Sequence, residues 1–321
     1  VIGMSIFMIG LFKKTVIADS MSMYVGTVFS GDHMTFFGAW IGALAYSLQL
    51  YFDFSGYSDM AFGLAKMFGI RLPINFFSPY KSPDIITFWR NWHMTLSRFL
   101  RDYIYIPMGG NRLGLSRRYF NLILTMLLGG LWHGAGWNFI FWGLLHGLYL
   151  MINHAWRRFT SYLRDESWQP KWWYTFISTM CTFIFVTFAW VFFRSENLDS
   201  AIMMAKVMWG LDGIIIHPII IDIFPFLDGI LQVQSGTEQW FGRLNPRIVV
   251  PQIILVMALV FILPNSYQYM RITVSLEGRS FPNLLPIYFC PNRLHAFLIA
   301  FITIWAFSFL NSQSEFLYFQ F

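Results

Sequence analysis

Apolar runs long enough to cross a membrane recur along this chain, and they leave little room for a water-soluble fold. Residues 137–154, 172–193, 248–264 and 294–310 are each predominantly apolar, and a membrane-crossing helix needs roughly 20 such residues. Charged residues make up only 12% of the chain, whereas soluble domains carry about 25%. The sequence therefore predicts an all-α protein that crosses a membrane several times.

The start of the chain is apolar as well. It begins at Val1 without an initiating Met and without a positively charged leader, so we expect a fragment of a longer protein that lacks its first spans. Residues 1–12 are interpreted as the tail of a span that ends at Lys13 and Lys14. We expect one membrane domain over residues 1–321, with a core segment at residues 51–155.

A long helix is predicted over residues 35–69, and it carries buried polar residues. At about 1.5 Å per residue this stretch exceeds the thickness of a bilayer. Asp53, Ser55 and Asp59 lie in its apolar sequence, where ionisable groups are costly and mark functional sites by default. The favoured interpretation is structural ion pairing with the arginines of residues 90–101. A proton or cation path is the alternative.

Residues 72–105 follow the long helix and are not a continuous apolar run. Three prolines in residues 72–84 exclude a regular helix there. Residues 85–105 then show helical periodicity, with Arg90, Ser97 and Arg101 on a polar side opposite an aromatic face. His93 falls at the border of the two faces. The pattern predicts an amphipathic helix that lies on the membrane surface or lines a wet cavity.

A second histidine follows a short apolar run. Residues 118–131 span about 21 Å as a helix, less than the roughly 30 Å of a hydrocarbon core. They are followed at once by Trp132, His133 and a Gly-Ala-Gly turn. Non-helical backbone at depth survives only beside protein or a water-filled cavity, so His133 is predicted to face a pocket. Proton exchange and a satisfied histidine at a helix break are equally favoured interpretations.

Other features give weaker signals. The loop at residues 107–114 contains Asn111 and Arg112 after two glycines and can hold a phosphate, although a plain turn is favoured. His146 and His154 share one helical face and are interpreted as packing residues. The two cysteines have no metal-ligand spacing, so no metal site is predicted. The net charge of +6 is dispersed, which argues against nucleic-acid binding.

Three long strings carry a family resemblance. They are YFDFSGYSDMAFGLAKMFGI at 51–70, PINFFSPYKSPDIITFWRNWHMTLSRFLRDYIYIPMGGNR at 73–112 and LLGGLWHGAGWNFIFWGLLHG at 127–147. In this order they resemble the membrane-bound O-acyltransferase family, nearest to the bacterial branch that O-acetylates alginate or peptidoglycan. The ending EFLYFQF at 315–321 is similar to the aromatic terminus of that branch.

The resemblance implies a fold and a reaction. The fold is polytopic and all-α, with re-entrant and interfacial helices around a central tunnel in the bacterial inner membrane. His133 matches the family's near-invariant histidine, and His93 matches the second histidine of the branch; both are the expected catalytic residues. Residues expected along the tunnel or at the donor site are Asp53, Ser55, Asp59, Arg90, Ser97, Arg101, Asn111, Arg112 and Trp132.

The resemblance also implies substrates and partners. The acyl donor is expected to be acetyl-CoA, with no bound cofactor. The acetyl group is expected to reach the polysaccharide through a periplasmic SGNH-type acetyltransferase, and membrane lipid surrounds the protein. A proton-coupled transporter or channel, or a non-catalytic scaffold of a polysaccharide export complex, are the rival functions. The absence of a second copy of either histidine string argues against a transporter, because transporters usually contain repeats.

Overall fold

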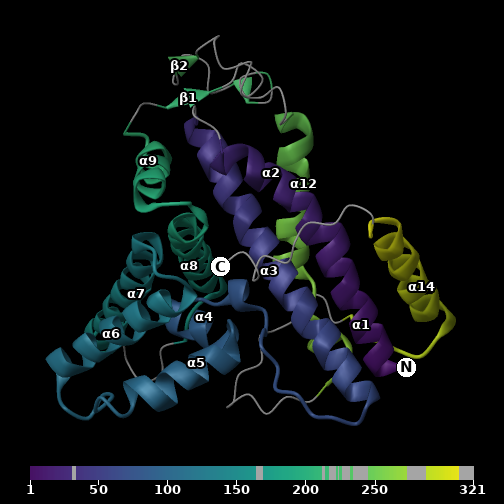
Figure 1. Ribbon diagram of the computed structural model, residues 1–321, viewed down its shortest axis with the longest axis horizontal. Coiled ribbons are helices and arrows are strands. Elements are labelled where there is room, and N and C mark those ends of the chain that lie inside the picture. The colour runs from purple at the N-terminus through teal and green to yellow at the C-terminus, as the bar shows by residue number, and fades with distance from the viewer. Residues whose placement is uncertain are drawn as a thin grey trace.

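The computed structural model describes residues 1–30, 34–163, 169–211, 214–216, 222, 224–225, 232–233, 245–272 and 287–310. The aromatic ending at 315–321 lies outside these residues. The described part is built of helices (Figure 1), apart from one parallel pair of two-residue strands, β1 (Ile215–Ile216) and β2 (Gln232–Val233). The prediction of an all-α architecture is confirmed apart from this short pair.

The first helical run does not end where the sequence suggested. Helix α1 (Ile2–Phe12), the π-helical turn η1 (Lys13–Ala18) and α2 (Asp19–Phe29) follow one another without a break (Figure 1). The helix thus continues beyond Lys13 and Lys14, where the span was predicted to end. The two ammonium groups form ion pairs with Asp59 and Asp53 on the neighbouring helix, α3. They therefore need no lipid headgroups as partners.

The predicted long helix is present as α3 (Phe36–Met67), and it forms the centre of the molecule. Thr35 caps its first turn by accepting a hydrogen bond from the backbone N–H of Gly38. One side of α3 runs along α1, η1 and α2, and α8 and α9 contact it as well (Figure 1). Asp53 and Asp59 therefore lie on the central helix of the molecule.

The amphipathic segment is two helices rather than one. Residues 71–78 are non-helical and lead into the 3₁₀ turn η2 (Pro79–Lys81). Helix α4 (Ile85–Asn91) starts at Asp84, whose side chain accepts from the backbone N–H of Thr87. Helix α5 (Met94–Leu100) and the π-helical turn η3 (Arg101–Tyr105) follow a break at His93. A continuous helix over 85–105 is wrong, because His93 adopts a left-handed backbone conformation with φ of 40°.

The second predicted break is confirmed. Helix α6 (Leu115–His133) ends at the histidine, and α7 (Trp137–Ser161) starts after a short non-helical turn. The two helices form a tight hairpin (Figure 1). A Cβ on Gly130 would lie 2.2 Å from the carbonyl oxygen of Phe139, and one on Gly143 would lie 2.3 Å from that of Met126. Glycine at these positions lets the two backbones touch.

The remaining helices cover the rest of the core. They are α8 (Trp172–Arg194), α9 (Leu198–Met208), α12 (Pro246–Ile262), α13 (Ser266–Tyr269) and α14 (Arg293–Ser308). Among the described residues, α8 alone has the length and apolar composition of a membrane-crossing helix, and Arg247–Ile262 and Arg293–Ser308 are shorter apolar helices. The predicted runs at 137–154 and 172–193 are helical throughout, and those at 248–264 and 294–310 are helical as far as Ile262 and Ser308. Several membrane crossings remain a prediction.

Candidate active site: two histidines at one pocket

The two residues that follow His93 are held by Asn75. The backbone N–H of Met94 donates to the carbonyl oxygen of Asn75 at 3.0 Å, and the Thr95 hydroxyl donates to the Asn75 side chain at 2.7 Å. The non-helical segment 71–78 therefore fastens the start of α5. The imidazole of His93 meets the ring of Phe54 on α3 edge to face, with centroids 4.8 Å apart.

His133 is the last residue of α6, and aromatic rings surround its imidazole. Ring centroids lie 5.3 Å away for Trp142 on α7, 4.9 Å for Phe193 on α8 and 5.0 Å for the exposed neighbour Trp132. The position at a helix end follows from the glycine turn after it, because the helix stops there and the next one starts at Trp137. Two helices and the turn between them thus fix the ring.

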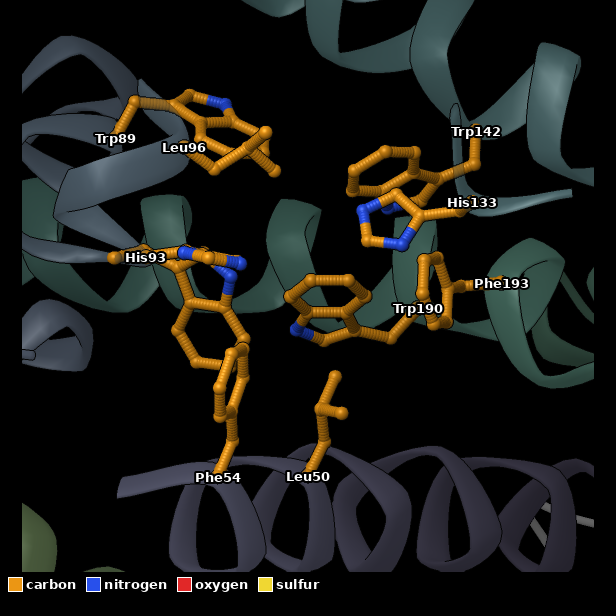
Figure 2. Close-up of a pocket in the computed structure, with 10 residues that line it drawn as sticks. Leu50, Phe54, Trp89, His93, Leu96, His133, Trp142, Trp190 and Phe193 are labelled. Carbon is orange, nitrogen blue, oxygen red and sulfur yellow. The ribbon is translucent and has the colours of Figure 1, made fainter. Parts of the chain in front are cut away.

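Both histidines line one pocket. Figure 2 shows them on different walls, with their imidazoles turned toward the space between. The cavity volume is small, about 20 Å³, which is room for roughly one water molecule. The residues around it come from α3 to α8 and are Leu50, Phe54, Trp89, Trp92, His93, Leu96, His133, Trp142, Trp190 and Phe193. The two imidazoles are the only ionisable side chains among these ten, so acid–base chemistry in this pocket depends on them.

The walls of the pocket are built of aromatic rings that contact one another. Trp190 lies 5.1 Å from Trp92 and stacks on Trp142 at 5.6 Å, measured between ring centroids. The indole N–H of Trp89 donates to Nδ1 of the fully buried His146 at 3.3 Å. His146 therefore supports the wall from behind, which agrees with its interpretation as a packing residue.

The two carboxylates of α3 belong to a different cluster. Nζ of Lys13 lies 2.7 Å from Oδ2 of Asp59, and the Ser266 hydroxyl of α13 donates to the same oxygen at 2.5 Å. Nζ of Lys14 lies 2.7 Å from Oδ1 of Asp53 and 2.8 Å from Oδ1 of Asp19. We expected arginines of 90–101 as partners; the two lysines take that place.

The other predicted site residues lie away from the pocket lining. Ser55 is buried in α3, and the Ser97 hydroxyl donates to the carbonyl oxygen of Trp92 at 3.0 Å. Arg101 is exposed and pairs with Asp102 at 2.7 Å. Further exposed positions are Arg90, Asn111, Arg112 and Trp132. Of the eleven predicted residues, His93 and His133 alone line the pocket, and the roles of the others stay predictions.

The glycine loop after η3 is anchored as a turn. Gly109 and Gly110 have positive φ of 99° and 53°. The side-chain amide of Asn121 on α6 donates to the carbonyl oxygens of Met108 and Gly110 at 3.1 and 3.0 Å. This geometry gives the loop a fixed shape next to α6, which fits the plain-turn interpretation.

Sequence reasoning missed the apolar lining of the pocket. Trp89, Trp92, Trp142, Trp190 and Phe193 belong to a chain in which 20% of residues are aromatic, so no aromatic residue stands out by type. A usable signal was proximity in sequence, because Trp92 precedes His93 and Trp142 lies nine residues after His133.

Comparisons with known proteins identify the family of this chain. A family model described as MBOAT, membrane-bound O-acyltransferase family, matches residues 2–200, which is more than half of the chain. A peptidoglycan O-acetyltransferase of Helicobacter pylori is 40% identical over 100% of this chain and 56% of its own length.

Two further relatives have related names. A probable alginate O-acetylase AlgI of Azotobacter vinelandii is 49% identical over 65% of this chain and 40% of its own length. A teichoic acid D-alanyltransferase of Bacillus subtilis is 30% identical over 60% of this chain and 51% of its own length. The chain thus spans about half the length of the relatives it matches. On the family match and the relative that covers the whole chain, this protein belongs to the membrane-bound O-acyltransferase family.

Proposed function

We propose that the whole protein transfers an acetyl group from acetyl-CoA, on the cytoplasmic side, to a hydroxyl on the other side of the bacterial inner membrane. The observation that carries the proposal is the pairing of His93 and His133 at one otherwise apolar pocket. The names of the relatives, a peptidoglycan O-acetyltransferase, a probable alginate O-acetylase and a teichoic acid D-alanyltransferase, support the reaction class. Alginate or peptidoglycan is the proposed acceptor polymer.

His133 acts as the general base in this proposal. Its imidazole takes the proton of the acceptor hydroxyl as that oxygen attacks the thioester carbonyl carbon. The carbon–sulfur bond of the tetrahedral intermediate then breaks, and the imidazolium returns the proton to the thiolate that leaves. The products are an O-acetyl ester and a free thiol, so atoms and charge balance. General base catalysis contributes typically 10²- to 10⁴-fold to a rate.

His93 stabilises the charge that develops on the carbonyl oxygen. It lies across the pocket from His133 (Figure 2), where a protonated imidazole can donate a hydrogen bond to the oxyanion. The other eight lining residues are aromatic or leucine. An apolar site strengthens electrostatic contacts and keeps water from hydrolysing the thioester.

The pocket is proposed to be part of a tunnel across a multi-pass domain. The donor enters from one end and the acceptor from the other, which explains why the two histidines come from different helices. Exposed cations such as Arg90, Arg101 and Arg112 are proposed to attract the phosphates of the donor. A periplasmic SGNH-type protein would pass the acetyl group to the polymer.

Membranes that contain the full-length protein test the proposal. The assay supplies acetyl-CoA labelled in the acetyl group and follows label that mild base releases from the polymer. His133→Ala should lower the rate by at least about 100-fold. The control is His295→Ala, at a half-buried position in the first turn of α14 and outside the pocket lining, which should transfer at the normal rate. Equal transfer by wild type and His133→Ala would remove the catalytic claim.

A further inference from the structure

Trp142 lies on α7 against His133, and its indole is enclosed by other rings. Only 2% of its surface is exposed. The His133 ring meets it edge to face at 5.3 Å, His146 lies at 4.9 Å and Trp190 stacks on it at 5.6 Å, all between centroids. The indole is thus held in one orientation at the wall of the candidate active site.

The N–H of this indole has no hydrogen-bond acceptor within the part of the chain that the structure describes. Two other tryptophans satisfy theirs: Trp40 donates to the carbonyl oxygen of Met208 at 3.1 Å, and Trp89 donates to His146. The Trp190 N–H, in the same pocket, is unsatisfied among the described residues as well, but among the tryptophans of the lining Trp142 is the one whose ring meets His133. A buried donor without an acceptor is destabilising, and each such group in a folded protein needs an explanation. An unsatisfied donor beside a proposed catalytic base points to an oxygen of the substrate.

The chemistry of indole restricts what this group can do. Indole is a donor only and does not exchange its proton near neutral pH, so Trp142 can be neither base nor acid. A fixed donor next to the base is the arrangement that stabilises an oxyanion. In Figure 2 the Trp142 nitrogen lies on the side of the indole nearest to the His133 ring.

We infer that the Trp142 N–H donates a hydrogen bond to the carbonyl oxygen of the acyl thioester, and that this bond strengthens when the oxygen becomes an oxyanion. The inference rests on the proposed acyl transfer and adds a second donor to His93. No proton moves from the indole: the bond forms to the oxyanion as the hydroxyl attacks, and it weakens when the carbon–sulfur bond breaks. The nitrogen is covered by its neighbours in the structure, so the acyl group must part the rings around it.

Trp142→Phe tests the inference, because it keeps an aromatic ring and removes the N–H. Kinetics with labelled acetyl-CoA in membranes of the full-length protein should show kcat reduced about 100-fold and KM for acetyl-CoA changed less than threefold. Binding of an unreactive ketone analogue of acetyl-CoA should change equally little, because its oxygen carries no developed charge. The matched control is Trp40→Phe, which removes a satisfied N–H outside the pocket and should leave kcat unchanged.

The results separate this inference from the proposed function. A kcat within threefold of wild type for Trp142→Phe, in a preparation where His133→Ala is inactive, would overturn the inference alone. A raised KM with normal kcat would overturn it too. If Trp142→Phe does not fold, replacing Trp142 with 3-benzothienylalanine removes the N–H and keeps the shape of the indole; normal kcat in that protein would also reject the inference. Normal transfer by His133→Ala would remove the proposed function itself.

Discussion

Gly10 of α1 and Gly56 of α3 lie backbone against backbone, and neither has room for a methyl group. A Cβ on Gly10 would lie 2.5 Å from the carbonyl oxygen of Gly56, and one on Gly56 would lie 2.7 Å from that of Gly10. Gly3 and Gly63 meet in the same way, seven residues earlier on α1 and seven later on α3. The two antiparallel helices therefore touch along one line at a spacing of two helical turns.

Gly56→Ala should separate these helices and destabilise the protein by about 1–3 kcal/mol, the usual cost of overpacking. Thermal unfolding in detergent, followed by aggregation or by intrinsic fluorescence, measures the change as a lower Tm. The matched control is Gly26→Ala on α2, where a Cβ would meet nothing within 4 Å; there alanine should be neutral or slightly stabilising. Equal effects at both positions would mean that the close contact is unimportant.

The buried pair of Lys13 and Asp59 should stabilise the fold only as a pair. Lys13→Met leaves a buried carboxylate without its cation and should cost about 3–5 kcal/mol. Lys13→Met combined with Asp59→Leu removes both charges and should recover most of that loss. Tm measurements on wild type, both single variants and the double variant give the coupling energy, which should be clearly different from zero.

An exposed ion pair provides the control for that cycle. Arg101 and Asp102 are 53% and 44% exposed at their side chains, and exposed pairs contribute little. Arg101→Met should leave Tm unchanged. If acetyl transfer survives in the Lys13→Met, Asp59→Leu protein, the pair is structural; a folded double variant without transfer would favour the alternative of a proton path.

His93→Asn separates the backbone role of this residue from its chemical role. Asparagine tolerates the left-handed conformation that His93 adopts, so Tm should stay close to wild type. The transfer rate should still fall at least about tenfold, because the amide cannot supply a positive charge to the oxyanion. His93→Val is the contrasting variant and should lower Tm, because a β-branched residue is strained at φ of 40°. Full activity in His93→Asn would contradict the proposed role.

Asp84 should matter more to stability than its ion-pair partner does. Its side chain caps α4 through the backbone N–H of Thr87 at 2.9 Å and also meets the guanidinium of Arg157 at 2.6 Å. Asp84→Ala loses the cap and should cost about 0.5–2 kcal/mol. Arg157→Ala removes a side chain that is 46% exposed and should have a smaller effect on Tm. The reverse order would show that the ion pair dominates.

Much of the helical content could be predicted because apolar runs and breakers are local signals. The prolines before α4 excluded a helix, and the Gly-Ala-Gly turn after His133 marked the end of α6. The break at His93 could not be predicted in the same way. Its neighbours have helical periodicity, and the left-handed turn depends on hydrogen bonds to Asn75, which lies 18 positions earlier in the sequence.

Of the candidate site, only the residues within recognisable sequence motifs could be predicted. His93 and His133 were named from their motifs, and their placement at one pocket agrees with the expectation that both face a common space. The partners of Asp53 and Asp59 were not found, because lysines at the end of an apolar run look like anchors at a membrane surface. Their true environment depends on how α1 lies against α3, and a single sequence does not state that.

The paired glycines also limit how the length of this segment can change. The close glycine contacts prevent α1 from sliding along α3. The number of residues between Gly10 and Lys13, which is two, therefore determines which way the side chains of Lys13 and Lys14 point from the helix. Deleting Leu11 would turn Lys13 and Lys14 by about 100° around the helix axis and leave Asp53 and Asp59 facing apolar atoms. Substitutions at Leu11 should therefore be tolerated far better than a one-residue insertion or deletion there.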